Sequence, residues 1–296
     1  MRIALTGASG RLGRAIYVRL APGHQIVGMD RTPSSTVAHV GDIGDAGLLR
    51  RALPGCDAII HTAALHAPHV DHVPDSEFER INIDATARLL DVAQAAGIPR
   101  IVFTSTTALY GDAATPVGRA GWVDEALPPQ PRTIYHRSKL AAEALLRQAA
   151  EQGGPRVTIL RVSRCFPEPA PLMAVYRLHR GIDARDVAEA HALALQDAAA
   201  PVRLYVISGA TPFRRDDAEA LFDDATRVIR ERAPALATAF CERGWPLPPR
   251  IDRVYDPALA MHELGWRPRY GFDEVLAWLD QGLAEVLPPQ RDWTPR

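Results

Sequence analysis

The stretch Thr6-Gly7-Ala8-Ser9-Gly10-Arg11-Leu12-Gly13 follows a short apolar run, residues 3–5, and leads into a helical pattern that continues to residue 20. This order predicts a strand, a glycine-rich turn and a helix. Glycines at every third position let the backbone turn tightly and approach a pyrophosphate, which the free N–H groups at the start of the helix would bind. The pattern after an N-terminal strand therefore indicates a dinucleotide-binding fold, with an ordinary glycine-rich turn as the alternative.

A second apolar run, residues 25–29, ends at Asp30 and is followed by Arg31. An acidic residue about 20 positions after the glycines can bind both ribose hydroxyls of NAD and would repel the 2′-phosphate of NADP. Because Arg31 could accept that phosphate, NADP stays open as the second choice behind NAD. Asp42 and Ile43 follow a third short run, 36–40, and are placed to contact the adenine ring.

Length and composition describe a soluble α/β protein. The chain has 296 residues, 47% of them apolar, which suits one large domain or a large domain with a small appendage. A net charge of −1 without a long basic run makes nucleic acid and anionic membranes poor partners. Three scattered cysteines, Cys56, Cys165 and Cys241, suggest a reducing compartment. The apolar run at the N-terminus is too short for a signal peptide, so we expect a cytoplasmic protein.

A fourth apolar run, residues 57–61, leads into Thr62-Ala63-Ala64, whose small side chains would let the chain pass close under a cofactor. A histidine-rich loop with His66, His69 and His72 comes next. Prolines interrupt this loop and it has no His-Glu-x-x-His helix, so we expect no metal site. The loop is predicted to line a substrate pocket, the alternative being a solvated loop.

Hydroxyl side chains follow the next predicted strand. A long helix is expected over residues 76–97, with Asn82 inside it, and then a strand over 100–103 that continues into Thr104-Ser105-Thr106. The carboxyl ends of parallel strands face the crevice in which ligands bind. The hydroxyls are therefore candidates for the site. The loop 112–132 that follows is expected to fold over it.

Tyr135 and Lys139 lie four residues apart in a window, 133–152, whose composition favours a helix. Both side chains would project from one face, within roughly 6 Å of each other. An ammonium beside a phenol lowers the phenol pKa, so the pair predicts a tyrosine that exchanges a proton with a substrate hydroxyl or carbonyl. Taken alone, the pair also fits an amphipathic helix without chemistry.

These motifs in this order resemble the extended short-chain dehydrogenases, the NAD-dependent epimerase/dehydratase family. The resemblance also includes Ala63-Ala64, Asn82, Ser105-Thr106 before Tyr110-Gly111, the stretch Asp183-Ala184-Arg185-Asp186-Val187-Ala188, and Glu263-Leu264-Gly265-Trp266-x-Pro268. It implies a doubly wound Rossmann sheet of parallel strands with a small C-terminal substrate-binding lobe. Residues 1–165 would form the NAD-binding domain. Residues 166–296 would form mainly the lobe, with some elements returning to the sheet and a loosely packed end at 288–296.

The resemblance implies roles for single residues. Tyr135 would be the general base, Lys139 would hold the nicotinamide ribose and lower the tyrosine pKa, and Thr106 would bind the reacting oxygen, with Ser105 as a possible helper. The expected cofactor contacts are Gly7, Ser9, Gly10, Arg11, Leu12, Gly13, Asp30, Arg31, Asp42, Ile43, Thr62, Ala63, Ala64, Asn82, Thr104, Ser105, Tyr135 and Lys139. The family also leads us to expect a homodimer that pairs the helices near 76–97 and 133–152.

The predicted substrate is a small, sugar-like molecule. The segment 162–181 is too short to clamp a nucleotide, and the sequence from Leu160 to Pro169 is similar to uronate dehydrogenases. Arg164 and Arg177 make this segment basic, so a substrate carboxylate or phosphate is a reasonable expectation. The expected substrate contacts are His66, Ser105, Thr106, Tyr135, Arg164 and Arg177.

The leading interpretation is an NAD-dependent oxidoreductase that transfers hydride between a hydroxyl of a sugar or sugar acid and NAD. A nucleotide-sugar epimerase would use the same residues. A catalytically silent NAD(P)-sensing protein is the alternative from another class, and retention of the tyrosine and lysine argues against it.

Overall fold

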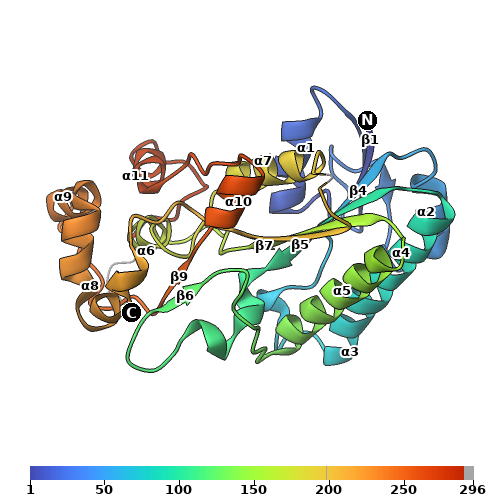
Figure 1. Cartoon of the computed structure of the whole chain (residues 1–296). Coiled ribbons are helices and arrows are strands. Elements are labelled where there is room, and N and C mark those ends of the chain that lie inside the picture. Colours follow the sequence, from blue (N-terminus) through green and yellow to red (C-terminus); the bar gives the residue numbers. More distant parts are fainter. Residues whose placement is uncertain (198, 290–296) are drawn as a thin grey trace.

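The fold is built on a sheet of seven parallel strands, as seen in a computed structural model that describes residues 1–197 and 199–289 (Figure 1). Their spatial order is β3-β2-β1-β4-β5-β7-β8. The strands are β1 (Arg2–Thr6), β2 (Gln25–Asp30), β3 (His39–Val40), β4 (Ala58–His61), β5 (Arg100–Thr106), β7 (Arg156–Val162) and β8 (Val202–Ile207). The order reverses between β1 and β4, so the predicted Rossmann sheet is confirmed and its ligand crevice lies at that reversal.

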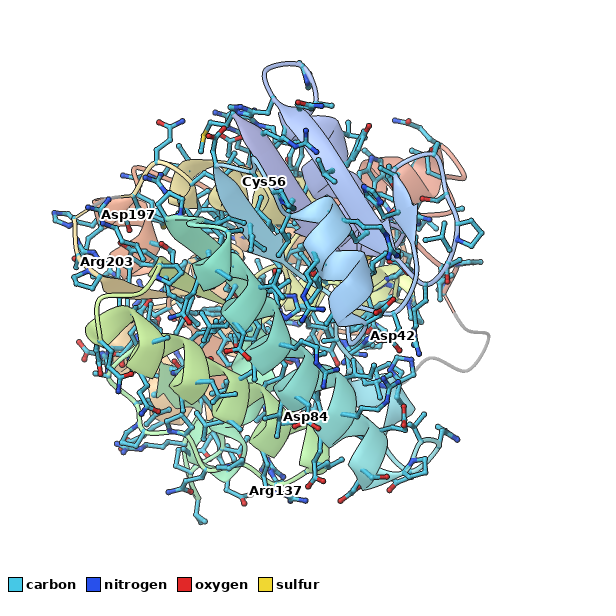
Figure 2. All side chains as sticks on the ribbon, turned by 90° about the vertical axis from the view of Figure 1, so that its right-hand side faces the viewer. Asp42, Cys56, Asp84, Arg137, Asp197 and Arg203 are labelled. Atoms are coloured by element: carbon cyan, nitrogen blue, oxygen red, sulfur yellow. The ribbon has the colours of Figure 1, made fainter. Side chains whose placement is uncertain are left out.

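Helices cover both faces of the sheet. One apolar core lies between the sheet and α1 (Arg11–Leu20), α7 (Ala184–Ala194) and α10 (Ala258–Glu263). A second core lies under α2 (Ala46–Ala52), α4 (Ala85–Ala95) and α5 (Ile134–Glu151). Figure 2 looks onto this second layer, with Asp84 and Arg137 labelled on its outer side. The strands, buried on both faces, are accordingly rich in Ile, Val and Leu.

The helix expected over residues 76–97 is interrupted, which corrects that prediction. The chain forms α3 (Asp75–Phe78), then a π-helical stretch, η2 (Glu79–Asp84), and then α4. A π-helical turn is wider than an α-helical one and commonly occurs at functional positions. Here it contains Asn82, which is buried and bonded to two other segments.

The C-terminal lobe packs beside the carboxyl edge of the sheet. Its apolar core joins α6 (Ala170–Tyr176), α8 (Ala218–Arg232), α9 (Pro234–Glu242) and α11 (Phe272–Asp280). α7 and β8 lie between α6 and α8 in the sequence, but they belong to the Rossmann layers. The chain therefore passes from the lobe into the Rossmann layers and then returns to the lobe.

The loop expected to cover the site lies elsewhere. Its strand β6 (Gly121–Val123) pairs in parallel with β9 (Arg253–Tyr255), and Trp122 donates a hydrogen bond to Asp256 at 2.8 Å. The prediction was wrong because Trp122, with a partner for its N–H, packs against the apolar core of the lobe. Short helical turns complete the described chain: η1 (Ala67–His69), η3 (Thr107–Tyr110), η4 (Asp112–Ala114) and η5 (Arg215–Asp217).

From residue 290 on, the expected loose end lies outside the described residues. Within residues 1–197 and 199–289, no helix has the length and apolarity needed to cross a membrane.

Candidate cofactor and substrate site

A cavity of about 380 Å³ lies along the carboxyl ends of β1, β2, β4, β5 and β7. Among the expected cofactor contacts, all except Asn82 line it. The cavity extends from Asp30 and Asp42 at one end to Tyr135 and Phe166 at the other. This length of crevice suits an extended molecule such as a dinucleotide.

The glycine turn leaves no room for side chains at two positions. Gly7 has φ of +71°, and a Cβ there would lie 2.5 Å from Thr62 Oγ1. A Cβ on Gly13 would lie 2.0 Å from the carbonyl oxygen of Gly7. Gly10 caps α1 without a side-chain hydrogen bond, and the first turn of α1 has no acidic residue. The helix start therefore offers unpaired N–H groups, which fit the phosphates of a dinucleotide.

Asp30 is held rigidly at the end of β2. Its carboxylate accepts a hydrogen bond from the Ser9 N–H at 3.1 Å and another from the Thr32 N–H at 3.0 Å. Arg31 lines the cavity beside it. This carboxylate is placed to accept hydrogen bonds from ribose hydroxyls, and it would repel a 2′-phosphate.

Asp42 lies at the same end of the cavity. Burial alone would raise the pKa of this carboxyl, but the Gly44 N–H and the guanidinium of Arg80 outweigh burial and lower the pKa. Asp42 is thus an anion that is already paired within the protein. Arg80 comes from η2, so the π-helical stretch also supports this end of the cavity.

Tyr135 and Thr106 meet at the other end. Tyr135 starts α5, and Thr106 ends β5 and caps η3 by accepting a hydrogen bond from the Ala108 N–H at 3.1 Å. Burial raises the pKa of the Tyr135 phenol to about 12, and a hydrogen bond with Thr106 partly offsets this rise. The expectation that the tyrosine pKa is tuned downward is wrong for this state, since the phenol is buried.

Lys139 lies one turn further along α5 and contacts β5. Its ammonium donates a hydrogen bond to the Thr104 carbonyl at 2.8 Å and lies 3.9 Å from the centroid of the Phe103 ring. Burial lowers the pKa of this ammonium to about 7, against the opposing charge of Glu143. The side chain therefore pairs with a backbone carbonyl, and its proton is held weakly.

Ser105 lies within a buried polar network. Its hydroxyl donates to Glu143, whose carboxylate also accepts two hydrogen bonds from Arg161, at 3.1 and 2.7 Å. Arg161 donates further to the Tyr110 hydroxyl at 3.0 Å. Although Ser105 reaches the cavity wall, its hydroxyl is committed to this network. Sequence reasoning missed Glu143, although Glu143 lies one helical turn after Lys139.

Asn82 does not line the cavity, which corrects its expected place among the cofactor contacts. Its side chain accepts from the Leu65 N–H at 2.8 Å, donates to the Leu65 carbonyl at 2.9 Å, and donates to the Ser138 hydroxyl at 2.9 Å. A buried amide with these partners fixes the loop after β4 against α5. Asn82 therefore positions the wall of the cavity and does not form it.

Arg164 and Arg177 do not reach this cavity either. Arg164 pairs with Glu168, and Arg177 is buried against Asp183 at 3.1 Å. Both guanidinium groups are neutralised within the fold, so the expected role of this basic segment in holding an anion is not supported. The sequence did contain a signal for this pairing, because Glu168 lies four residues after Arg164 and Asp183 lies six residues after Arg177.

His66 lines the cavity as predicted and contacts an aromatic side chain that sequence reasoning missed. Its ring stacks on Phe166 with a centroid distance of 5.9 Å. Val162, Ser163 and Cys165, which end or follow β7, complete this wall. The described residues contain no cluster of three His, Cys, Asp or Glu side chains that could hold a metal ion.

A Rossmann sheet with an uncapped glycine turn and a Thr-Tyr-Lys site defines a dinucleotide-binding protein of the short-chain dehydrogenase type. The profile described as "NAD dependent epimerase/dehydratase family" matches residues 3–169, more than half of the chain. The chain belongs to this family, as the motifs predicted.

Two curated relatives act on sugars or sugar acids, by their names. The chain is 34% identical over 170 residues to the L-arabinose 1-dehydrogenase (NAD(P)(+)) of Haloferax volcanii, covering 54% of this chain and 66% of the relative. It is 31% identical over 177 residues to the uronate dehydrogenase of Agrobacterium fabrum, covering 57% and 63%. The match thus spans just under two thirds of each relative. The predicted similarity to uronate dehydrogenases is confirmed.

Solved structures share the fold over nearly the whole chain. A short-chain dehydrogenase/reductase superfamily protein from Agrobacterium tumefaciens with bound NAD superimposes with a TM-score of 0.70 at 22% identity, covering 94% of this chain and 95% of that one. A dTDP-glucose 4,6-dehydratase double mutant from Streptomyces venezuelae, with NAD bound, gives 0.69 at 23% identity over 94% and 95%.

Proposed function

We propose that this protein is an NAD-dependent dehydrogenase that oxidises a hydroxyl of a small sugar-like substrate, with Tyr135 as the proton acceptor. The observation that carries the proposal is that Tyr135 and Thr106 line the same cavity as Asp30 and lie close enough for the Thr106 side chain to lower the pKa of the Tyr135 phenol. A substrate oxygen placed between these two hydroxyls could exchange a proton with Tyr135 while Thr106 orients it. The names of the two curated relatives support a sugar or sugar acid as substrate.

The residues of the chain supply binding and proton transfer. Bound NAD would accept the hydride. The start of α1 would bind the phosphates and Asp30 the adenosine ribose. With a pKa of about 12, Tyr135 is neutral at pH 7 and is ready to donate a proton to a carbonyl. The oxidation direction requires the phenol to lose that proton, which a protonated Lys139 one turn away would favour.

Asp30 supports NAD as the preferred cofactor. Its carboxylate is fixed by two backbone N–H groups, so it cannot easily turn away from a ribose 2′-phosphate. Arg31 lines the same wall and would attract the 2′-phosphate of NADP, which would reduce the preference for NAD. We therefore expect activity with both cofactors and a lower KM for NAD.

The test is a cofactor-reduction assay. Purified protein is mixed with NAD, and separately with NADP, and offered free aldoses, uronic acids and nucleotide sugars while reduced nicotinamide is followed by absorbance. Reduction with a free sugar or sugar acid would support the dehydrogenase. Tight NAD binding without net reduction would overturn it in favour of a nucleotide-sugar epimerase or an NAD(P) sensor.

We also propose that the protein is a cytoplasmic homodimer that pairs the outer faces of α4 and α5. The family resemblance supports this proposal, and Figure 2 shows that the two helices lie side by side. Light scattering coupled to gel filtration tests it. A mass of 32.3 kDa, that of one chain, would refute the dimer.

A further inference from the structure

We infer that the substrate end of the cavity selects a neutral sugar ring over the same ring carrying a carboxylate. This inference rests on the proposed dehydrogenase function and narrows its substrate class. It concerns the wall formed by His66, Val162, Ser163, Cys165 and Phe166 around Tyr135, called here the Tyr135 end.

Each of the four arginines in residues 161–180 faces an acid of the fold. The pairs are Arg161 with Glu143 at 2.7 Å, Arg164 with Glu168, Arg177 with Asp183 at 3.1 Å, and Arg180 with Asp252 at 3.5 Å. Two of these arginines, Arg161 and Arg177, are almost completely buried, so their charges cannot turn toward a ligand without breaking a buried pair. The positive charges of this segment are therefore neutralised by acids of the protein itself.

Arg164 lies against Phe166, a residue of the Tyr135 end, but does not line the cavity itself. The guanidinium lies 5.6 Å from the centroid of the Phe166 ring. Together the two residues line a second, small void of about 10 Å³. A carboxylate at the Tyr135 end could therefore contact Phe166, whereas Arg164 is not part of the cavity wall.

Three cations line the cavity itself. In the described part of the chain they are Arg11, Arg31 and Lys139. Arg11 pairs with Glu285 and also contacts the Cys165 thiol, Arg31 follows Asp30, and Lys139 donates a hydrogen bond to the Thr104 carbonyl. Burial also keeps the Cys165 thiol neutral, since it raises the thiol pKa to about 11. The guanidinium beside this end, that of Arg11, is already paired with Glu285. A carboxylate moved into this end would therefore lose its water without meeting an unpaired cation, and this is unfavourable.

The same wall offers contacts that suit a neutral ring. The Ser163 side chain is buried, and its hydroxyl has no hydrogen-bond partner within the protein. Such a hydroxyl is normally satisfied, so it is available to a substrate hydroxyl. The stacked rings of His66 and Phe166 present an aromatic surface to the C–H face of a sugar ring.

Two series of sugars isolate the charge. L-arabinose, D-galactose and D-galacturonic acid share one ring configuration and differ only in the C5 substituent, and D-xylose, D-glucose and D-glucuronic acid form the matching series. We would measure kcat/KM for each with saturating NAD. In at least one series, kcat/KM for the neutral sugars should exceed kcat/KM for the uronic acid by about tenfold or more, as expected when a buried charge lacks a partner.

Variants of Glu168 and Arg164 test the cause. Glu168→Gln removes the carboxylate that neutralises Arg164. The ratio of kcat/KM for the uronic acid to kcat/KM for the neutral sugar should therefore rise several-fold. Arg164→Ala should leave the neutral-to-acid ratio of the native protein unchanged. In the double variant the gain of Glu168→Gln should disappear. A parallel binding measurement, titrating each sugar into the NADH complex by calorimetry, keeps the test valid if a variant loses turnover.

The outcomes separate this inference from the function on which it rests. Faster turnover of the uronic acids would overturn the inference and leave the dehydrogenase standing. An unchanged ratio in Glu168→Gln would refute the charge argument. No reduction of NAD by any sugar, despite bound NAD, would remove the proposed function and this inference together.

Discussion

The ammonium of Lys139 donates its hydrogen bond to the carbonyl of Thr104, 2.8 Å away. This contact joins α5, which carries Tyr135, to β5, which carries Thr106. The lysine is thus part of the packing that brings the two hydroxyls together. Lys139 is also the one lysine in the sequence, which makes its chemistry directly measurable.

The first prediction concerns the charge of Lys139. Because burial lowers its pKa to about 7, protein labelled with ¹³C-lysine should show one Cε resonance that titrates near pH 7. The unfolded state, in which the side chain keeps its ordinary pKa near 10.5, binds more protons between these two values. Stability should therefore rise with pH from about 7 to 10.5.

Lys139→Met provides the matching control. The variant lacks this titration. The unfolding free energy of the variant minus that of the native protein should therefore be largest below pH 7 and should decrease as the pH rises. Urea unfolding at pH 6 and pH 9 measures the difference. A midpoint near 10.5 in the resonance, or a difference that is independent of pH, would contradict the prediction.

A second prediction separates proton transfer from cofactor binding. Tyr135→Phe keeps the ring but removes the hydroxyl, whose pKa the neighbouring Thr106 side chain lowers. Turnover should fall about 10²- to 10⁴-fold, the usual contribution of a general acid or base. NAD affinity, measured by calorimetry, should change by no more than a few-fold. Full activity of this variant would exclude Tyr135 as the proton acceptor.

A third prediction addresses the buried pair of Glu143 and Arg161. Both side chains are nearly inaccessible, and Glu143→Gln would leave the guanidinium without its counter-charge. Removing one partner of such a pair costs about 3–5 kcal/mol, which denaturant unfolding can measure. Glu143→Leu combined with Arg161→Met should recover part of that loss. A double variant less stable than Glu143→Gln would show that the charges themselves stabilise the fold.

A fourth prediction tests the glycine turn. In Gly13→Ala the new Cβ would lie 2.0 Å from the Gly7 carbonyl, so the turn must shift, and NAD binding should weaken by more than tenfold. Gly23→Ala is the control, because no atom lies within 4 Å of the added Cβ. That variant should bind NAD normally. Equal NAD affinity in the two variants would indicate that the turn does not hold the cofactor.

A fifth prediction concerns cofactor choice. Asp30→Asn preserves an oxygen acceptor for the Ser9 or Thr32 N–H but removes the negative charge. The ratio of kcat/KM for NAD to that for NADP should fall about tenfold or more, since the repulsion of the 2′-phosphate is lost. Steady-state kinetics with both cofactors measures the ratio. If the ratio is unchanged, Asp30 does not discriminate between them.

Several features of the site could be predicted because they depend on short spacings. The glycines of 7–13 set the turn and the start of α1, and Tyr135 and Lys139 share a helix face because one turn separates them. The parallel sheet was expected from the family resemblance that these motifs carry, and its strand order is seen only in the structure. The glycine turn and the shared helix face are local properties, so the sequence by itself determined them.

Other features depend on residues that lie far apart in the chain. Asn82 bonds Leu65 and Ser138, and its place inside a π-helical stretch cannot be read from local periodicity. The pKa values of Tyr135 and Lys139 follow from burial, which exists only once α5 packs on β5. Arg164 and Arg177 look like ligands for an anion in the sequence, but folding places an acid beside each. Tertiary structure therefore decided which charges are free, because desolvation and pairing belong to the packed chain.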